Sequence, residues 1–218
     1  MTNRSEPAGG NASDLPPVVL VVDDDQSMRS ALENLFQSVG LDVRTFSSAS
    51  ELTSRGLPNV VSCLVLDVRL PGLLSGLDLQ AELAKTGVQI PIILMTSHGD
   101  IPMSVTAMKA GAVDFLAKPF RDQDMLNAVA SALDRDRKRR ESEIATKQLR
   151  TLFESLSQRQ REIMTRVTAG KMNKHIAEEL GLKEITVKIH RGHVMRKMRA
   201  KSLADLVRIA EALGVGGK

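Results

Sequence analysis

The sequence predicts an α/β domain with a five-stranded, doubly wound parallel sheet, followed by a small all-α domain of four helices. Five short apolar runs lie near residues 17–22, 42–46, 61–66, 91–95 and 113–117. Apolar runs of about four to eight residues that are bounded by turn signals are typical of fully buried strands. Stretches with helical spacing alternate with them, near residues 26–38, 48–55, 75–86, 101–110 and 122–135. This alternation indicates βαβ units and a parallel sheet.

Glycine, proline and the composition of the N-terminal tail set the limits of the α/β domain. Gly40 follows the first helical stretch, as a glycine at a helix C-terminus commonly does. Pro91 opens the fourth apolar run, where a missing N–H costs least. Residues 1–16 are rich in Gly, Pro, Ser and Asn, so we expect a disordered tail there. The α/β domain is therefore expected over residues 17–121.

A charged linker is expected over residues 122–154, which contain no Gly or Pro. This segment includes the last helix of the α/β domain. Its middle, DRDRKRRESE, mixes both signs of charge, as in a solvated helix with i,i+4 ion pairs. A disordered tether is the alternative.

The C-terminal domain is expected over residues 155–218 as four short helices. Ser157 can cap the first, with Gln160 in capping-box position. The next helix is expected between a capping Asn173 and Gly181, followed by a longer helix over about 183–199. Ser202 is expected to cap the last helix.

The two halves of the chain carry opposite charge. Residues 1–120 contain 8 Lys or Arg and 13 Asp or Glu, whereas residues 121–218 contain 22 and 13. A basic half joined to an acidic one suggests two tasks, one of them contact with a polyanion such as nucleic acid.

Composition also limits where the protein acts. No apolar stretch approaches the roughly 18 residues of a membrane span, and the N-terminus lacks the apolar segment of a signal peptide. Cys63 is the only cysteine, and in an apolar strand it is expected to be a buried, inert thiol rather than a redox sensor. We expect a cytoplasmic, soluble protein with no membrane partner.

Polar side chains follow four of the apolar runs where the predicted strands end. They are Asp23, Asp24 and Asp25 after the first run, Asp67 after the third, Thr96 after the fourth and Lys118 after the fifth. Because the carboxyl ends of the strands in an open α/β sheet share one edge, where ligands bind, these side chains are expected to converge on one pocket.

The expected pocket suits phosphoryl transfer. Neighbouring carboxylates repel one another unless a cation joins them, and Mg²⁺ is the usual hard cation where phosphate is handled. An Asp carboxylate can attack phosphorus and form an aspartyl phosphate. Lys118 and Mg²⁺ would neutralise the phosphoryl oxygens, and the Thr96 hydroxyl could hydrogen-bond one of them.

Residues 17–121 resemble the receiver domain of response regulators, a flavodoxin-like fold. The resemblance implies that Asp67 is the phosphoacceptor and also a Mg²⁺ ligand. It further implies that Asp24 binds the metal directly, that Asp23 acts largely through water, and that the Arg69 backbone carbonyl completes the protein ligands. Asp25 alone is better explained as a turn or cap residue.

The same resemblance implies a switch. Thr96 and Lys118 correspond to the family's switch hydroxyl and lysine, Phe115 to its aromatic switch residue, and Lys118-Pro119 to its cis peptide. One departure is a loop from Pro71 to Gly76 that is one residue longer than usual. Loops tolerate such insertions, although this one can alter metal geometry or the lifetime of the phosphoryl group.

Residues 155–210 resemble a helix-turn-helix of the LuxR/FixJ (NarL) type. NKHIAEELGL supplies the first helix and the turn, and KEITVKIHRGHVMRKM the recognition helix. Val187, Val194 and Met198 are expected on its apolar face, while Lys188, Arg191 and Arg196 point more toward solvent, as entry into a major groove requires. The expected DNA contacts are Lys174, Thr186, Lys188, Arg191, His193 and Arg196, whereas His190 is expected to pack and orient the helix.

Together the two resemblances imply a two-component response regulator and not a multiple-turnover enzyme; the receiver catalyses only its own phosphotransfer and autodephosphorylation. The implied partners are a sensor histidine kinase, double-stranded promoter DNA, a second copy of the chain on phosphorylation, and RNA polymerase. Candidate dimer residues are Met103, Val105, Ala107 and Ala110, some of which must face the core instead.

Two alternatives remain open at this point. Asp23-Asp24-Asp25-Gln26-Ser27 approximates the start of haloacid-dehalogenase-type phosphohydrolases, but that hypothesis leaves Asp67 without a role. An output domain that binds RNA or protein is the other. RNA readers usually need aromatic stacking platforms, and the chain has no Trp or Tyr.

Overall fold

The computed structural model describes residues 15–70, 75–97 and 101–216. The chain divides into two compact units between Arg140 and Glu141, inside a single helix. The predicted disordered tail, residues 1–16, lies outside the described residues except for Leu15 and Pro16.

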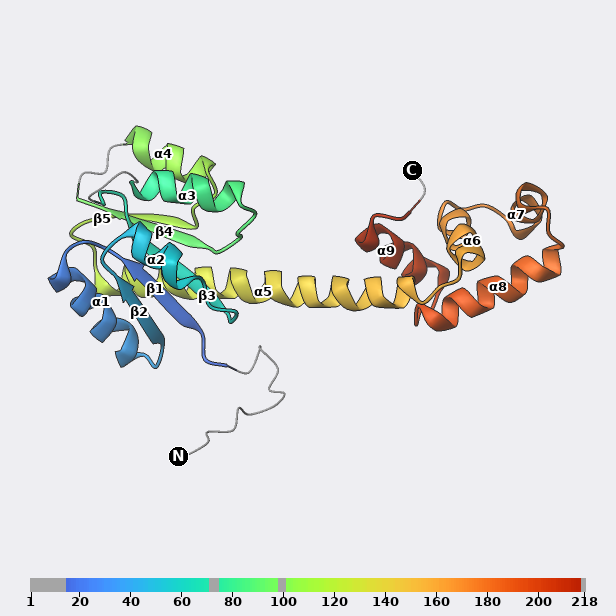
Figure 1. The fold of residues 1–218 in the computed structure, drawn as a ribbon, viewed down its shortest axis with the longest axis horizontal. Coiled ribbons are helices and arrows are strands. Elements are labelled where there is room, and N and C mark those ends of the chain that lie inside the picture. Colours follow the sequence, from blue (N-terminus) through green and yellow to red (C-terminus); the bar gives the residue numbers. More distant parts are fainter. Residues whose placement is uncertain (1–14, 71–74, 98–100, 217–218) are drawn as a thin grey trace, which may run out of the picture. The chain divides into compact units, whose positions relative to one another are not determined.

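The N-terminal unit is built on the predicted parallel sheet, which is confirmed (Figure 1). Its strands run in the order β2-β1-β3-β4-β5, and Val18 lies opposite both Asp42 and Ser62. Every strand begins and ends within one residue of the predicted bounds. The strands are β1 Val18–Val22, β2 Asp42–Phe46, β3 Ser62–Asp67, β4 Ile92–Thr96 and β5 Asp114–Ala117.

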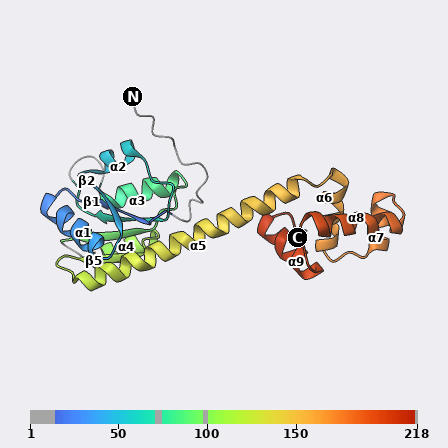
Figure 2. The same cartoon turned by 90° about the horizontal axis from the view of Figure 1, so that it is seen from below.

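Helices cover both faces of this sheet (Figures 1 and 2). They are α1 Gln26–Ser38, α2 Ala49–Arg55, α3 Gly76–Lys85, α4 Ile101–Lys109 and α5 Asp122–Glu154. Val19 and Val21 pack with α1 and α5, whereas Leu20 and Val22 pack with α2, α3 and α4. Because successive side chains of a strand point to opposite faces, burial on both sides explains the continuous apolar sequence of β1.

Cys63 is buried within β3, as expected for an inert thiol. Burial raises the pKa of the Cys63 thiol to about 12, and the charge of Asp136 adds to the shift. The reactive thiolate is therefore scarce at neutral pH.

The charged linker is helical, since α5 continues to Glu154. It carries the expected i,i+4 ion pair between Asp134 and Lys138, with an N–O distance of 2.7 Å. The expectation of a fully solvated run was wrong at Asp136, whose side chain is 1% exposed. Asp136 accepts hydrogen bonds from the Ser62 backbone N–H and from Arg140, at 3.0 and 2.7 Å. A buried carboxylate thus ties α5 to the first residue of β3.

The C-terminal unit packs four helices around its own core. They are α6 Gln158–Thr168, α7 Asn173–Leu180, α8 Glu184–Lys197 and α9 Leu203–Leu213. Ser157 and Ser202 cap α6 and α9, as predicted, and Gln160 completes the capping box. The predicted cap at Asn173 was wrong. Met172 precedes α7 without a side-chain cap, and Oδ1 of Asn173 instead accepts a hydrogen bond from Arg191.

Candidate functional site

The ends of β1, β3 and β5 bring two carboxylates and a lysine together. Asp67 is the last residue of β3, and Asp23 directly follows β1. Lys118 Nζ donates to Oδ2 of both, at 2.6 Å to Asp67 and 2.7 Å to Asp23. Asp23 is fully buried and Asp67 is 5% exposed, so water hardly screens the ion pairs.

The ionisation of Lys118 reflects two opposing effects. Burial alone would lower the pKa of the ammonium group. Hydrogen bonds and charge interactions with Asp23 and Asp67 outweigh burial, so the pKa of Lys118 is raised. Lys118 is therefore a fixed positive charge at this strand edge at neutral pH.

Three carboxylates can serve a metal ion here. Asp23, Asp24 and Asp67 each offer one oxygen, and these oxygens lie within 4.8 Å of one another. Asp24 is exposed, so the cluster opens to solvent on one side. Oxygen ligands with two or three negative charges suit a hard divalent cation, so the pocket can bind Mg²⁺.

The backbone after Asp67 is held close to its carboxylate. Asp67 Oδ1 accepts the Arg69 backbone N–H at 2.9 Å, and the Gly76 N–H donates to the Val68 carbonyl at 3.0 Å. A Cβ on Gly76 would lie 2.2 Å from the Asp67 carbonyl oxygen. Only glycine fits this close approach. The predicted longer loop between Pro71 and Gly76 falls on residues 71–74, outside the described residues.

The predicted switch residues occupy neighbouring strands. Thr96 is the last residue of β4 and is fully buried, and its carbonyl accepts the Lys118 N–H at 2.7 Å. Phe115 in β5 is half-buried and packs against the core on the α2–α4 side of the sheet. The Lys118–Pro119 peptide is cis, as the resemblance implies.

Two neighbours of the acidic pair have structural tasks. Asp25 caps α1 by accepting the Ser27 N–H at 2.8 Å, as its sequence context suggested. Sequence reasoning missed Arg29, whose Nη1 donates to the Asp23 carbonyl at 2.7 Å. Arg29 stands one turn into α1, and no motif distinguished it from a solvated arginine.

The recognition helix α8 has the predicted apolar face. Val187, Val194 and Met198 are buried, and Lys188 and Arg196 are exposed on other sides. Of the remaining predicted contacts, Lys174 in α7 is exposed, while Thr186 and His193 are half-buried.

Arg191 lies nearer the buried face than expected. It follows Val187 by four residues and precedes Val194 by three, so all three share one side of the helix. Its Nη1 donates to Asn173 Oδ1 at 3.2 Å, which links α8 to α7. The half-buried His190 packs edge to face with His193, with ring centroids 6.4 Å apart.

Sequence reasoning also missed two apolar side chains on α8. Ile185 and Ile189 are 59% and 52% exposed, although isoleucine is among the residue types most often buried. They lie one turn apart on the side away from Val187 and Val194, beside Lys188. Helical spacing could have found them, because neither fits the apolar stripe.

Among the candidate dimer residues on and just after α4, Ala107 is fully buried and faces the core. Met103 is half-buried against the same core, whereas Val105 is 45% exposed and Ala110 is exposed. Met108, which was not a candidate, is also 45% exposed.

Comparison with known proteins agrees with both halves. The family described as "Response regulator receiver domain" matches residues 19–130, and "Bacterial regulatory proteins, luxR family" matches residues 154–210. The chain therefore belongs to the response regulators that join a receiver domain to a LuxR-type DNA-binding domain.

Individual relatives match over nearly the whole chain. Nodulation protein W of Bradyrhizobium diazoefficiens is 62% identical over 91% of this chain and 87% of that protein. Response regulator protein TodT of Pseudomonas putida is 45% identical over 92% of this chain and 88% of its own length. A low-resolution structure of the response regulator StyR is 46% identical, covers 90% of this chain and 99% of that one, and has a TM-score of 0.78.

Family membership decides between the earlier alternatives. A receiver domain implies a histidine kinase as partner, and a LuxR-type domain implies DNA binding, so the phosphohydrolase and RNA-reader hypotheses are set aside. None of the described helices combines the length and apolar character that a membrane crossing requires.

Proposed function

We propose that the chain is a switch in which phosphorylation of Asp67 controls DNA binding by α8. The segments would divide as predicted: residues 17–121 receive the phosphoryl group, residues 122–154 connect, and residues 155–218 bind DNA. The proposal rests on the two ion pairs that Lys118 forms with Asp67 and Asp23. They hold the proposed phosphoacceptor, Asp67, against the lysine that would neutralise phosphoryl charge.

In the proposed reaction, a carboxylate oxygen of Asp67 attacks the phosphorus of a phosphohistidine on the kinase. The P–N bond breaks, its electron pair returns to the histidine, and an aspartyl phosphate forms. Lys118 would move its hydrogen bond from Oδ2 of Asp67 to a phosphoryl oxygen. Asp23 would keep Lys118 at the site during this exchange, since both ion pairs share one Nζ. The receiver contributes positioning and charge neutralisation to this phosphotransfer. It would contribute in the same way to its later autodephosphorylation.

Mg²⁺ is the proposed cofactor. Asp24 and Asp67 would bind it directly, Asp23 largely through water, and the Arg69 carbonyl would complete the protein ligands. When bound, Mg²⁺ would neutralise charge on the phosphoryl oxygens and lower repulsion among the three carboxylates.

Thr96 and Phe115 would transmit the change. The Thr96 hydroxyl lies at the same strand edge and could bind a phosphoryl oxygen, and Phe115 is near enough to the surface to change its packing. The face formed by α4, β5 and α5 would then pair with a second copy, with Val105 and Ala110 as contacts. Two recognition helices would reach half-sites about one helical turn apart. RNA polymerase is a further proposed partner at the promoter. The proposed location of the protein is the cytoplasm.

Within the DNA-binding domain, the proposed contacts divide by exposure. Lys188, Arg196 and Lys174 can reach phosphates or base edges, since they are exposed. Thr186 and His193 would contact DNA at the edges of α8, and Arg191 would mainly orient Asn173 and the helix. Ile185 and Ile189 offer apolar surface that suits thymine methyl groups.

Incorporation of phosphate from labelled acetyl phosphate tests the chemical step. Wild-type protein is expected to become labelled only with Mg²⁺ present, and Asp67→Asn to remain unlabelled. Equal labelling of Asp67→Asn would contradict the proposal.

A further inference from the structure

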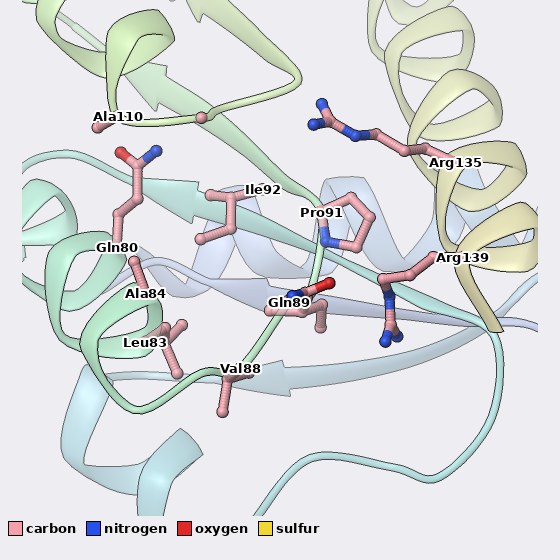
Figure 3. A pocket seen from close by; sticks show the side chains of 12 residues that line it. Gln80, Leu83, Ala84, Val88, Gln89, Pro91, Ile92, Ala110, Arg135 and Arg139 are labelled. Atoms are coloured by element: carbon pink, nitrogen blue, oxygen red, sulfur yellow. The ribbon is translucent and has the colours of Figure 1, made fainter. Parts of the chain in front are cut away.

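We infer that a hollow at the opposite end of the sheet binds a small organic acid with a carboxylate, an apolar body and a hydroxyl or amide donor. The hollow lies beside Ile92, at the start of β4, whereas the phosphoryl site lies where the strands end (Figure 3). Its volume is about 350 Å³, enough for a one-ring compound. Helices α3 and α5, strand β4 and the turn that follows α4 contribute to its lining, all within the N-terminal unit.

The wall of the hollow is largely apolar. Leu83 at the end of α3 and Val88, Ile90 and Pro91 in the connection to β4 line it, together with Ile92. Figure 3 shows Pro91 and Ile92 between the α3 side and the α5 side of the hollow. An apolar wall with few polar groups is the usual composition of a small-molecule site.

One side of the hollow supplies positive charge. Arg135 and Arg139 stand one turn apart on α5 and both project beside the hollow (Figure 3). Arg139 pairs with Asp136 at 2.6 Å, whereas Arg135 forms no ion pair or hydrogen bond with another described residue. A free guanidinium presents a planar pair of N–H donors that matches a carboxylate.

The other side supplies an unused acceptor. Gln80 in α3 lies across the hollow from Arg135 (Figure 3) and is 3% exposed. Its Nε2 donates to the Ala107 carbonyl at 3.3 Å, but its Oε1 is buried and has no partner among the described residues. Buried polar atoms are nearly always satisfied, so an orphaned one at a cavity wall indicates a missing donor.

These three features together define the ligand class. Arg135 selects a negative charge, the apolar wall selects a hydrocarbon body over inorganic phosphate, and Gln80 selects an O–H or N–H group at the far end. The site is separate from the proposed phosphoryl chemistry, so either assignment can fail without the other.

The test is a titration of the ¹⁵N-labelled full chain with 4-hydroxybenzoate, followed by backbone amide shifts in NMR spectra. Saturable shifts are expected at Val88 and Gly111, which line the hollow. Arg135→Ala should weaken binding about tenfold, the loss expected when one charge-assisted hydrogen bond is removed. Arg137→Ala is the matched control, because Arg137 is exposed on the same helix and does not line the hollow.

Related probes separate the contributions. Benzoate should bind several-fold more weakly than 4-hydroxybenzoate to the wild type. To Gln80→Leu, which lacks the amide, the two ligands should bind equally well. The uncharged 4-hydroxybenzamide and inorganic phosphate should bind far more weakly. The inference is overturned if no saturable shifts occur at these amides, if Arg135→Ala binds as well as Arg137→Ala, or if phosphate gives the same shifts.

Discussion

The ammonium nitrogen of Lys118 lies 2.6 Å from Oδ2 of Asp67, although 51 residues separate the two in sequence. The same nitrogen contacts Asp23, so one cation joins the ends of three strands. The arrangement places one positive charge between two nearly buried carboxylates beside the proposed metal site. It also makes the stability of this edge depend on the charge of Lys118.

The first prediction concerns Lys118→Met and pH. The folded-state pKa of Lys118 is raised by Asp23 and Asp67, so its stabilising contribution is complete below the unfolded value of about 10.4 and declines as pH rises through the raised folded value. The free energy of unfolding of Lys118→Met should therefore fall below that of the wild type by a constant amount between pH 7 and 9, and the gap should narrow in more alkaline solution. Denaturant titrations measure this difference in unfolding free energy. Lys85→Met is the control, because Lys85 is exposed. If the difference in unfolding free energy already narrowed below pH 9, a group other than Lys118 would dominate its pH dependence.

The second prediction compares two glycines. Gly76→Ala would place a Cβ 2.2 Å from the Asp67 carbonyl oxygen, which the strand end must move to avoid. We expect a loss of about 1–3 kcal/mol in the free energy of unfolding, with weaker Mg²⁺ binding and slower phosphorylation. Gly192→Ala in α8 meets nothing within 4 Å and should stabilise the chain by about 0.5–1 kcal/mol. Equal effects of the two substitutions would refute the steric argument.

The third prediction concerns the carboxylate that ties α5 to β3. Asp136→Ala removes the partner of Arg139, Arg140 and the Ser62 N–H, and should cost about 3–5 kcal/mol. Asp134→Ala breaks only the exposed pair with Lys138 and should cost less than about 0.5 kcal/mol. Urea unfolding followed by circular dichroism distinguishes them, and a loss below 1 kcal/mol for Asp136→Ala would mean that the buried pairs contribute little.

The fourth prediction concerns the recognition helix. Lys188→Ala should weaken promoter binding and lower its salt dependence by about one counterion, because the exposed Lys188 of α8 is proposed to contact a phosphate. Labelling by acetyl phosphate should stay at the wild-type rate. Lys85→Ala, in the other unit, should leave DNA binding unchanged. A Lys188→Ala protein that cannot be phosphorylated would show that its role has been misplaced.

The strand ends were predictable from sequence because burial on both faces gives each strand a continuous apolar run. The polar residue after the run then marks the sheet edge, as at Asp67 and Thr96. Backbone capping was mostly predictable too, as at Ser157. The cap predicted at Asn173 was wrong because its side chain accepts a hydrogen bond from the more distant Arg191.

Contacts between distant segments were not predictable. Asp136 sits in a run of mixed charges that any solvated helix could show, and only the packing of α5 against β3 buries it. The hydrogen bond from Arg191 to Asn173, 18 residues away, is of the same kind. The hollow with Gln80 depends on where α3 and α4 end and on which side of α5 faces β4, which local spacing does not specify.

Control of DNA binding by Asp67 is tested by measuring the affinity for promoter DNA with and without acetyl phosphate, for wild type and Asp67→Asn. We predict that acetyl phosphate and Mg²⁺ tighten binding by the wild type and leave Asp67→Asn at its basal affinity. Equal stimulation of both proteins would contradict it, because DNA binding by α8 would then not depend on a phosphoryl group at Asp67.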